Sequence, residues 1–170
     1  DNYYVESNEI FAKVLIDKQS PFLKSVVVNK GSKNNVKMGM VVLDSEYLIG
    51  KIVEVNYLSA RVLLLSDLNS KIPVSIEPGD IQSILSGTGK NYGIIQYQKQ
   101  EYIIEENSIV YTSGAGGLFK SGIPVGKTET INSPSIENEK ISINERVNFF
   151  SDFSQLRFVK ILSYTSEKTK

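Results

Sequence analysis

Apolar residues in this chain recur in short runs that are rich in β-branched side chains and are separated by turn-forming residues. Turn signals return at roughly the 8–12 residue spacing that is typical of β-sandwiches and β-barrels. Apolar positions at helical spacing are nearly missing. The pattern therefore predicts β-strands at residues 11–16, 25–28, 40–43, 48–55, 60–65, 71–76, 81–85, 92–97, 109–111, 123–130, 141–143 and 157–162.

One turn cluster is the best candidate for a seam between two halves. It is the run Glu77-Pro78-Gly79-Asp80, and each half is then about the smallest size at which a closed barrel buries a useful core. We therefore predict an all-β chain with little helix, made of two small β-barrel subdomains of the six-stranded type at 8–77 and 78–165. The last strand is free to pack back on the first subdomain.

Composition narrows the possible chemistry. A hydrophobic fraction of 41% and a charged fraction of 22% are typical of a folded domain. The 19 basic and 19 acidic residues balance, so no overall field favours nucleic acid as a partner. The chain has no Cys and no His, which excludes thiolate nucleophiles, a Ser-His-Asp triad and His-ligated zinc. We predict neither a cofactor nor a metal.

Residues 110–127 hold five glycines and a proline between two apolar runs. A dinucleotide-binding loop is excluded because its third glycine would fall at Phe119, and a P-loop because its first would fall at Ser121. Catalysis by Ser113 would need a lysine base, so a turn serine is the favoured interpretation. We predict a β-corner with Ile123 and Val125 facing inward and Phe119 near the surface, where it could contribute to an interaction surface.

Three tyrosines could extend such a surface. Tyr92, Tyr97 and Tyr102 alternate with polar residues, and aromatic side chains with a polar tip are favoured at protein interfaces. The alternative is that they fill the core or cover the mouth of a barrel.

The order of the motifs resembles a known family, the rod shape-determining protein MreC, over about residues 12–163. The matching pieces are Val28-Asn29-Lys30-Gly31-Ser32, then 36–42, 48–52, 59–64, Ser66-Asp67, and above all 112–114 through 122–127. The chain departs from the family pattern at Asn34-Asn35, Asn107-Ser108 and Lys120. The signature positions are Gly31, Gly39, Gly50, Thr112, Ser113, Gly114, Gly117, Gly122, Pro124 and Gly126.

The resemblance implies a membrane helix and a coiled-coil segment before this region, which places the protein in the inner membrane as a single-pass protein with this region in the periplasm. It also implies a non-catalytic scaffold of the cell-elongation machinery that works through exposed strand edges and apolar patches. The implied partners are the protein itself, as dimer or filament, a penicillin-binding transpeptidase, MreD and MreB. The alternative is a degenerate protease-like double barrel that binds an extended peptide or glycan between the barrels.

Overall fold

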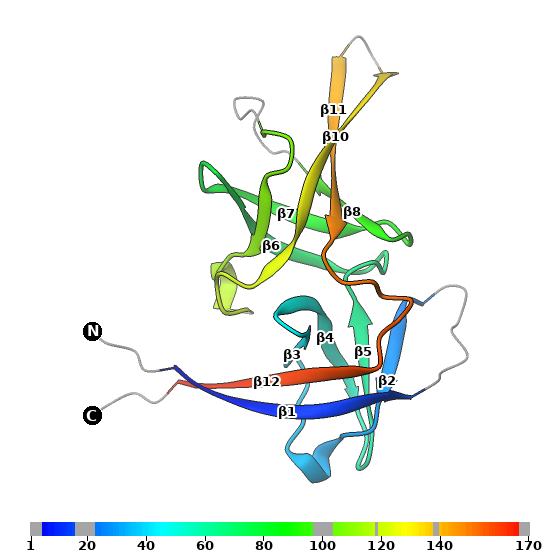
Figure 1. Ribbon diagram of the computed structural model, residues 1–170, viewed down its shortest axis with the longest axis vertical. Coiled ribbons are helices and arrows are strands. Elements are labelled where there is room, and N and C mark those ends of the chain that lie inside the picture. The colour runs from blue at the N-terminus through cyan, green and yellow to red at the C-terminus, as the bar shows by residue number, and fades with distance from the viewer. Residues whose placement is uncertain (1–4, 16–22, 97–103, 118, 138–139, 167–170) are drawn as a thin grey trace.

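The computed structural model describes residues 5–15, 23–96, 104–117, 119–137 and 140–166. Their strands form two closed antiparallel barrels, one above the other in Figure 1, and the only helical elements among them are two single 3₁₀ turns. The predicted all-β fold of two six-stranded barrels is therefore confirmed. The described residues include no helix with the length and hydrophobicity that crossing a membrane requires.

The first barrel takes its strands from both ends of the chain. In sheet order they are β1 (Val5–Leu15), β12 (Phe158–Ser166), β3 (Val41–Asp44), β4 (Tyr47–Val55), β5 (Ala60–Leu64) and β2 (Ser25–Val28). The ladder between β1 and β12 runs from Val5 opposite Ser166 to Lys13 opposite Phe158. The last strand thus packs on the first and completes this barrel.

The second barrel is continuous in sequence. In sheet order its strands are β10 (Pro124–Glu137), β11 (Lys140–Phe149), β8 (Tyr92–Gln96), β7 (Ile81–Gly87), β6 (Lys71–Glu77) and β9 (Ile109–Thr112). The boundary predicted between 77 and 78 is wrong, because those residues form the turn of the β6–β7 hairpin inside this barrel. The chain passes from one barrel to the other between β5 and β6.

Each barrel has its own group of buried side chains, produced by the two-residue alternation of the strands. The first barrel encloses mainly valine and alanine together with isoleucine, among them Val42, Ile49 and Ile161. The neighbours of these residues, Leu43, Leu48 and Leu162, face the opposite side of the same strands and are buried in the other cluster.

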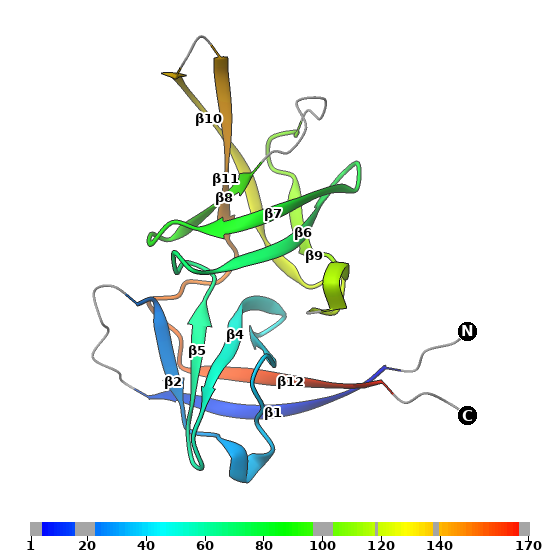
Figure 2. The ribbon, with the colours of Figure 1, turned by 180° about the vertical axis from the view of Figure 1, so that it is seen from behind.

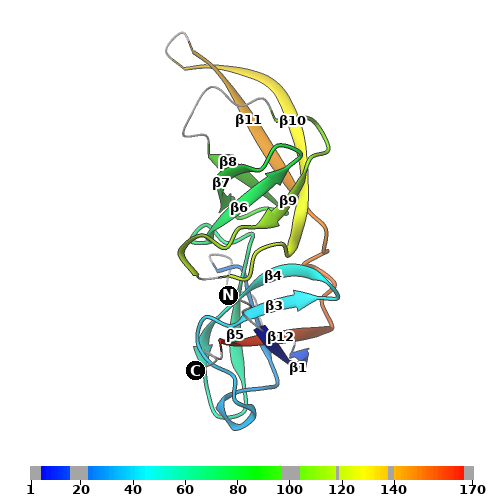
Figure 3. The ribbon, with the colours of Figure 1, turned by 90° about the vertical axis from the view of Figure 1, so that its left-hand side faces the viewer.

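That other cluster joins the two barrels. The outer wall of the first barrel contributes Leu43, Leu48 and Leu162, and these pack with the core of the second barrel. The wall lies directly beneath the second barrel in the side view of Figure 3. Because apolar burial stabilises at about 25 cal/mol per Å², a shared cluster of this kind fixes the two barrels against each other.

Aromatic and polar contacts close the rim of the joint. The rings of Tyr47 and Phe150 lie 5.0 Å apart, and Phe149 stacks on Phe153 at 4.9 Å. The Ser151 hydroxyl donates a hydrogen bond to the Asp44 carboxylate. The segment that leads from β11 to β12 is therefore held against the β3–β4 turn.

The ladders close both barrels, although some strands extend past the closing pairs. β1 pairs with β2 only at Val14 and Leu15, and β12 pairs with β3 only over 160–162, so the predicted open strand edges are present along part of the β1–β12 ribbon. A second ribbon of this kind lies beyond Thr128 and Glu145, where the described residues of β10 and β11 pair only with each other. This two-stranded arm projects past the second barrel at the top of Figure 2. Closure elsewhere removes the usual template for adding a strand.

Candidate binding surfaces

The glycine-rich segment between β9 and β10 forms a corner of the second barrel. The Thr112 hydroxyl donates to the carbonyl of Lys120 at 2.6 Å and accepts from the N–H of Ile123 at 3.0 Å. Thr112 also pairs through its backbone with Gly122 and Ile123, both at 2.9 Å. One buried threonine therefore ties together the two ends of the loop.

Two of the signature glycines show why this corner needs them. Gly122 has φ of +87°, a left-handed conformation that side chains disfavour. A Cβ on Gly126 would lie 2.3 Å from the Asn148 carbonyl oxygen, so β10 and β11 approach too closely for any side chain there. Both positions serve the β-corner that the sequence predicts.

The other signature positions also lie at turns and close contacts. Gly114 follows β9, Gly117 lies in the 3₁₀ turn η2 (Ala115–Gly117), and Pro124 begins β10. In the first barrel Gly50 lies in β4, while Gly31 and Gly39 flank the 3₁₀ turn η1 (Ser32–Asn34) and the loop before β3.

The expectation that Phe119 lies near the surface is wrong. Its side chain is 6% exposed and belongs to the cluster shared by the two barrels. The physical reason is that the corner folds toward the joint between the barrels, so the Phe119 side chain is buried in their shared cluster. Ile123 and Val125 are buried as predicted.

Ser113 lies in an open groove of about 430 Å³ beside the corner, here called the corner groove. Its hydroxyl accepts a hydrogen bond from the N–H of Ala115 at 3.3 Å, which is a turn arrangement. The groove is lined by Ser75, Glu77, Asp80, Gln82, Tyr111, Thr112, Ser113, Gly114, Ala115, Ser121 and Gly122. None of these side chains is a lysine that could act as the base for a serine nucleophile.

Asp80 is already engaged inside the corner groove. Its Oδ1 accepts from the Ser75 hydroxyl and from the Gln82 amide, both at 2.8 Å. Across the described residues, no three His, Cys, Asp or Glu side chains come together as a set of metal ligands. The Asp80 carboxylate thus serves to join the two strands of the β6–β7 hairpin.

Of the three tyrosines predicted as a surface, only Tyr92 lies within the described residues. It is half-buried, and the Arg146 guanidinium stacks over its ring with 3.7 Å from Cζ to the ring centroid. Such cation–π contacts stabilise locally, so Tyr92 covers the wall of the second barrel. Tyr97 and Tyr102 lie outside the described residues.

Sequence reasoning missed a second groove, on the first barrel. Phe11 and Phe158 are 67% and 69% exposed. Phe11 lies opposite Lys160 and Phe158 opposite Lys13, so the two rings are diagonal neighbours on one face. With Asp44, Ser45, Gln155, Arg157, Val159 and Lys160 they line an open groove of about 410 Å³, here called the aromatic groove.

The alternation of β1 could have identified this surface. Ile10, Ala12 and Val14 pack in the first barrel, so the intervening Phe11 and Lys13 must face outward. Lys160 contacts Glu9 at 3.8 Å, whereas Lys13 and Arg157 make no ion pair with a described residue. The aromatic groove therefore combines two exposed rings with two cations, Arg157 and Lys160, and one carboxylate, Asp44.

These features define a class of protein, a double β-barrel module with exposed candidate binding surfaces. Comparison with known proteins places the chain within that class. The family described as "Rod shape-determining protein MreC, barrel core" matches residues 14–163. The chain belongs to this family of cell-shape proteins.

Individual relatives agree with the assignment. The cell shape-determining protein MreC of Cereibacter sphaeroides is 29% identical over 149 residues, covering 88% of this chain and 47% of the relative. This chain thus spans about half the length of the curated relatives it matches. The crystal structure of MreC from Pseudomonas aeruginosa superposes with a TM-score of 0.81 and 28% identity, covering 91% of this chain and 98% of the other.

A third solved structure shares the fold. It is described as a complex between penicillin-binding protein PBP2 and MreC from Helicobacter pylori. The TM-score is 0.65 at 18% identity, and the match covers 92% of this chain and 98% of that chain. At this identity the likeness concerns the fold alone.

Proposed function

We propose that this chain is the extracytoplasmic, non-catalytic scaffold region of a cell-elongation protein, and that it binds a penicillin-binding transpeptidase through the aromatic groove. Family membership supports a role in cell shape, and the Helicobacter pylori complex supports this class of partner. The observation that carries the proposal is the pair of exposed rings, Phe11 and Phe158, on a wall of paired strands.

The groove suits a protein partner for three reasons. Exposed aromatic side chains supply much of the binding energy at protein interfaces. The backbone of Phe11 and Phe158 is already held by the ladder between β1 and β12, so little conformational freedom is lost on binding. Arg157 in the groove, and Lys13 next to it opposite Phe158, favour a partner segment that carries a carboxylate close to an apolar side chain.

The whole protein's further contacts belong to the same proposal. We expect self-association, as dimer or filament, and contacts with MreD and MreB that use parts of the protein outside these residues. We also expect a membrane anchor before this region, with the barrels on the periplasmic side. The alternative of a peptide or glycan cleft between the barrels has less support, because apolar side chains fill the joint.

The test is a binding titration against the periplasmic part of the elongation transpeptidase from the same organism. We expect Phe11→Ser combined with Phe158→Ser to weaken binding about tenfold or more. Leu68→Ser is the matched control, because Leu68 is 65% exposed and lies away from the groove. Unchanged affinity in the double variant, or no binding by the parent chain, would overturn the proposal.

A further inference from the structure

A second exposed surface lies at the end of the first barrel that faces away from the second barrel. It consists of the loop 29–40 and the β4–β5 turn 56–59, here called the basic tip, at the bottom of Figure 1. The N–H of Ser32 donates to the Asn56 carbonyl at 2.9 Å, and the N–H of Lys33 to the Tyr57 carbonyl at 3.0 Å. These bonds hold the two loops side by side.

The basic tip exposes large apolar side chains. Met38, Tyr57 and Leu58 are 65%, 64% and 60% exposed. They project from loops whose backbone is fixed, and neither the corner groove nor the aromatic groove reaches them. A tyrosine beside aliphatic side chains at the end of a domain is suited to a boundary between water and hydrocarbon.

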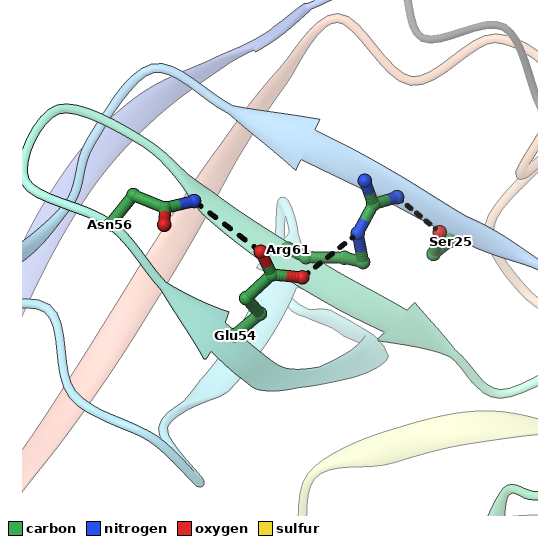
Figure 4. Close-up of polar contacts among 4 residues, drawn as sticks. All are labelled: Ser25, Glu54, Asn56 and Arg61. Atoms are coloured by element: carbon green, nitrogen blue, oxygen red, sulfur yellow. Dashed lines mark hydrogen bonds and ion pairs between the residues drawn. The ribbon is translucent and has the colours of Figure 1, made fainter.

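The charged side chains of the two loops that form the basic tip are all lysines. Lys33 and Lys37 are exposed and Lys30 is half-buried. The stretches 23–43 and 47–66 contain a single carboxylate, Glu54. Its Oε2 lies 3.4 Å from the Arg61 Nε, and its Oε1 accepts from the Asn56 amide at 3.5 Å, as Figure 4 shows. Arg61 also donates to the Ser25 hydroxyl at 2.9 Å, so this network is held to the barrel wall.

We propose that the basic tip binds the surface of a bilayer that contains anionic phospholipid, with Tyr57, Leu58 and Met38 entering the interface and the lysines contacting headgroup phosphates. Juxtamembrane lysines and shallowly inserted apolar side chains are the two recognised sources of such binding. The chain as a whole has no net charge, so the attraction must come from this local group. Because the basic tip projects from the barrel, it fits a deformable lipid surface better than it fits a rigid pocket on a protein.

The experiment measures co-sedimentation of the 170-residue chain with vesicles of equal parts phosphatidylglycerol and phosphatidylcholine, and with phosphatidylcholine alone. Each lysine near an anionic surface contributes about fivefold in partitioning. We therefore expect Lys33→Gln with Lys37→Gln to lower the partition coefficient about 25-fold. The matched control, Lys71→Gln with Lys90→Gln, makes the same charge change at exposed positions of the second barrel and should have little effect.

The apolar contribution is tested separately. Tyr57→Ser with Leu58→Ser should abolish binding at physiological salt, where the screening length is about 8 Å, whereas Leu68→Ser should not change it. Equal losses for the two lysine pairs would show general charge attraction and overturn the proposal. Failure of the parent chain to prefer phosphatidylglycerol would overturn it too. So would loss of self-association, measured by sedimentation velocity, in tip variants whose vesicle binding is unchanged. None of these results depends on transpeptidase binding.

Discussion

The two barrels differ in how their strands follow one another along the chain and in which residues fill their cores. The first draws β1 and β12 from opposite ends of the chain, yet its inner cluster contains only its own residues. The second is built from consecutive strands, yet its cluster includes Leu43, Leu48 and Leu162 of its neighbour. Continuity in sequence therefore does not make a structural unit self-sufficient.

The dependence of the second barrel on the first is tested most directly by separating the two barrels. We expect residues 70–150 expressed alone to lack a cooperative unfolding transition, because the base of their core loses the leucines of the first barrel. Replacement of 70–150 by a short linker should leave a first barrel that still unfolds cooperatively. Circular dichroism melts of both chains provide the measurement. A cooperative transition in the isolated 70–150 chain at the parent midpoint would contradict the dependence.

A pair of neighbouring residues tests the same dependence within the intact chain. Leu48 and Ile49 are both fully buried, Leu48 at the joint and Ile49 inside the first barrel. Each change to Ala should lower the free energy of unfolding by about 2–5 kcal/mol.

The two variants should differ in where protection from hydrogen exchange is lost. Leu48→Ala should reduce protection across the second barrel, because its core opens at the joint. Ile49→Ala should act first on the first barrel. Identical exchange patterns in the two variants would mean that the joint has no separate role.

Close contacts between strands allow the two barrels to be perturbed one at a time, with a smaller expected effect on stability. A Cβ on Gly50 would lie 2.0 Å from the Leu63 carbonyl oxygen, and one on Gly126 2.3 Å from that of Asn148. We expect either change to Ala to cost about 1–3 kcal/mol in chemical denaturation, since strands must separate to admit a methyl group.

The barrel affected should again differ. Gly126→Ala should loosen the second barrel alone, whereas Gly50→Ala should disturb both, because β4 also carries Leu48. Gly39→Ala is the control, since no atom lies within 4 Å of its added Cβ and only the positive φ is strained. A larger cost at Gly39 than at Gly50 would refute the steric explanation.

The smallest effect concerns the connector between the barrels. The hydroxyl and the N–H of Ser154 both donate to Asp152, and they lower the pKa of that carboxyl below its usual value. A lowered pKa in the folded state means that any stabilisation is present above the ordinary pKa and is lost as the pH falls through the folded one.

Because Asp152 is exposed, Ser154→Ala should raise this pKa toward its usual value with little effect on either barrel. A pH titration of the Asp152 carboxyl carbon by NMR measures the change. An unmoved pKa would show that the hydrogen bond from the Ser154 hydroxyl does not lower it in solution.

Local sequence patterns predicted the strands well because alternation and turn residues act over a few positions. Gly122 and Pro124 correctly indicated a corner rather than a phosphate loop. The barrel boundary could not be found in this way, since the Glu77–Asp80 turn resembles a linker while closing a hairpin. The long-range pairing of β6 with β9 places this turn in the second barrel.

Burial at single positions was harder to predict for the same reason. Phe119 stands among glycines and polar residues, and only the contact between barrels buries it. Phe11 looked like part of an apolar strand, although its neighbours Ile10 and Ala12 take the inner face. The side chains that matter most for the candidate surfaces were those whose environment depends on the other barrel or on strand orientation.

The pairing of β1 with β12 also governs the order of events during synthesis. The first strand leaves the ribosome long before its partner at Phe158–Ser166 exists. At 5–20 residues per second, the delay is on the order of ten seconds. In that interval β1 must stay unpaired along this edge, and a chain cut short before β12 has no means of completing its first barrel. Premature termination products should therefore be open, exposed chains that quality-control proteases can readily remove.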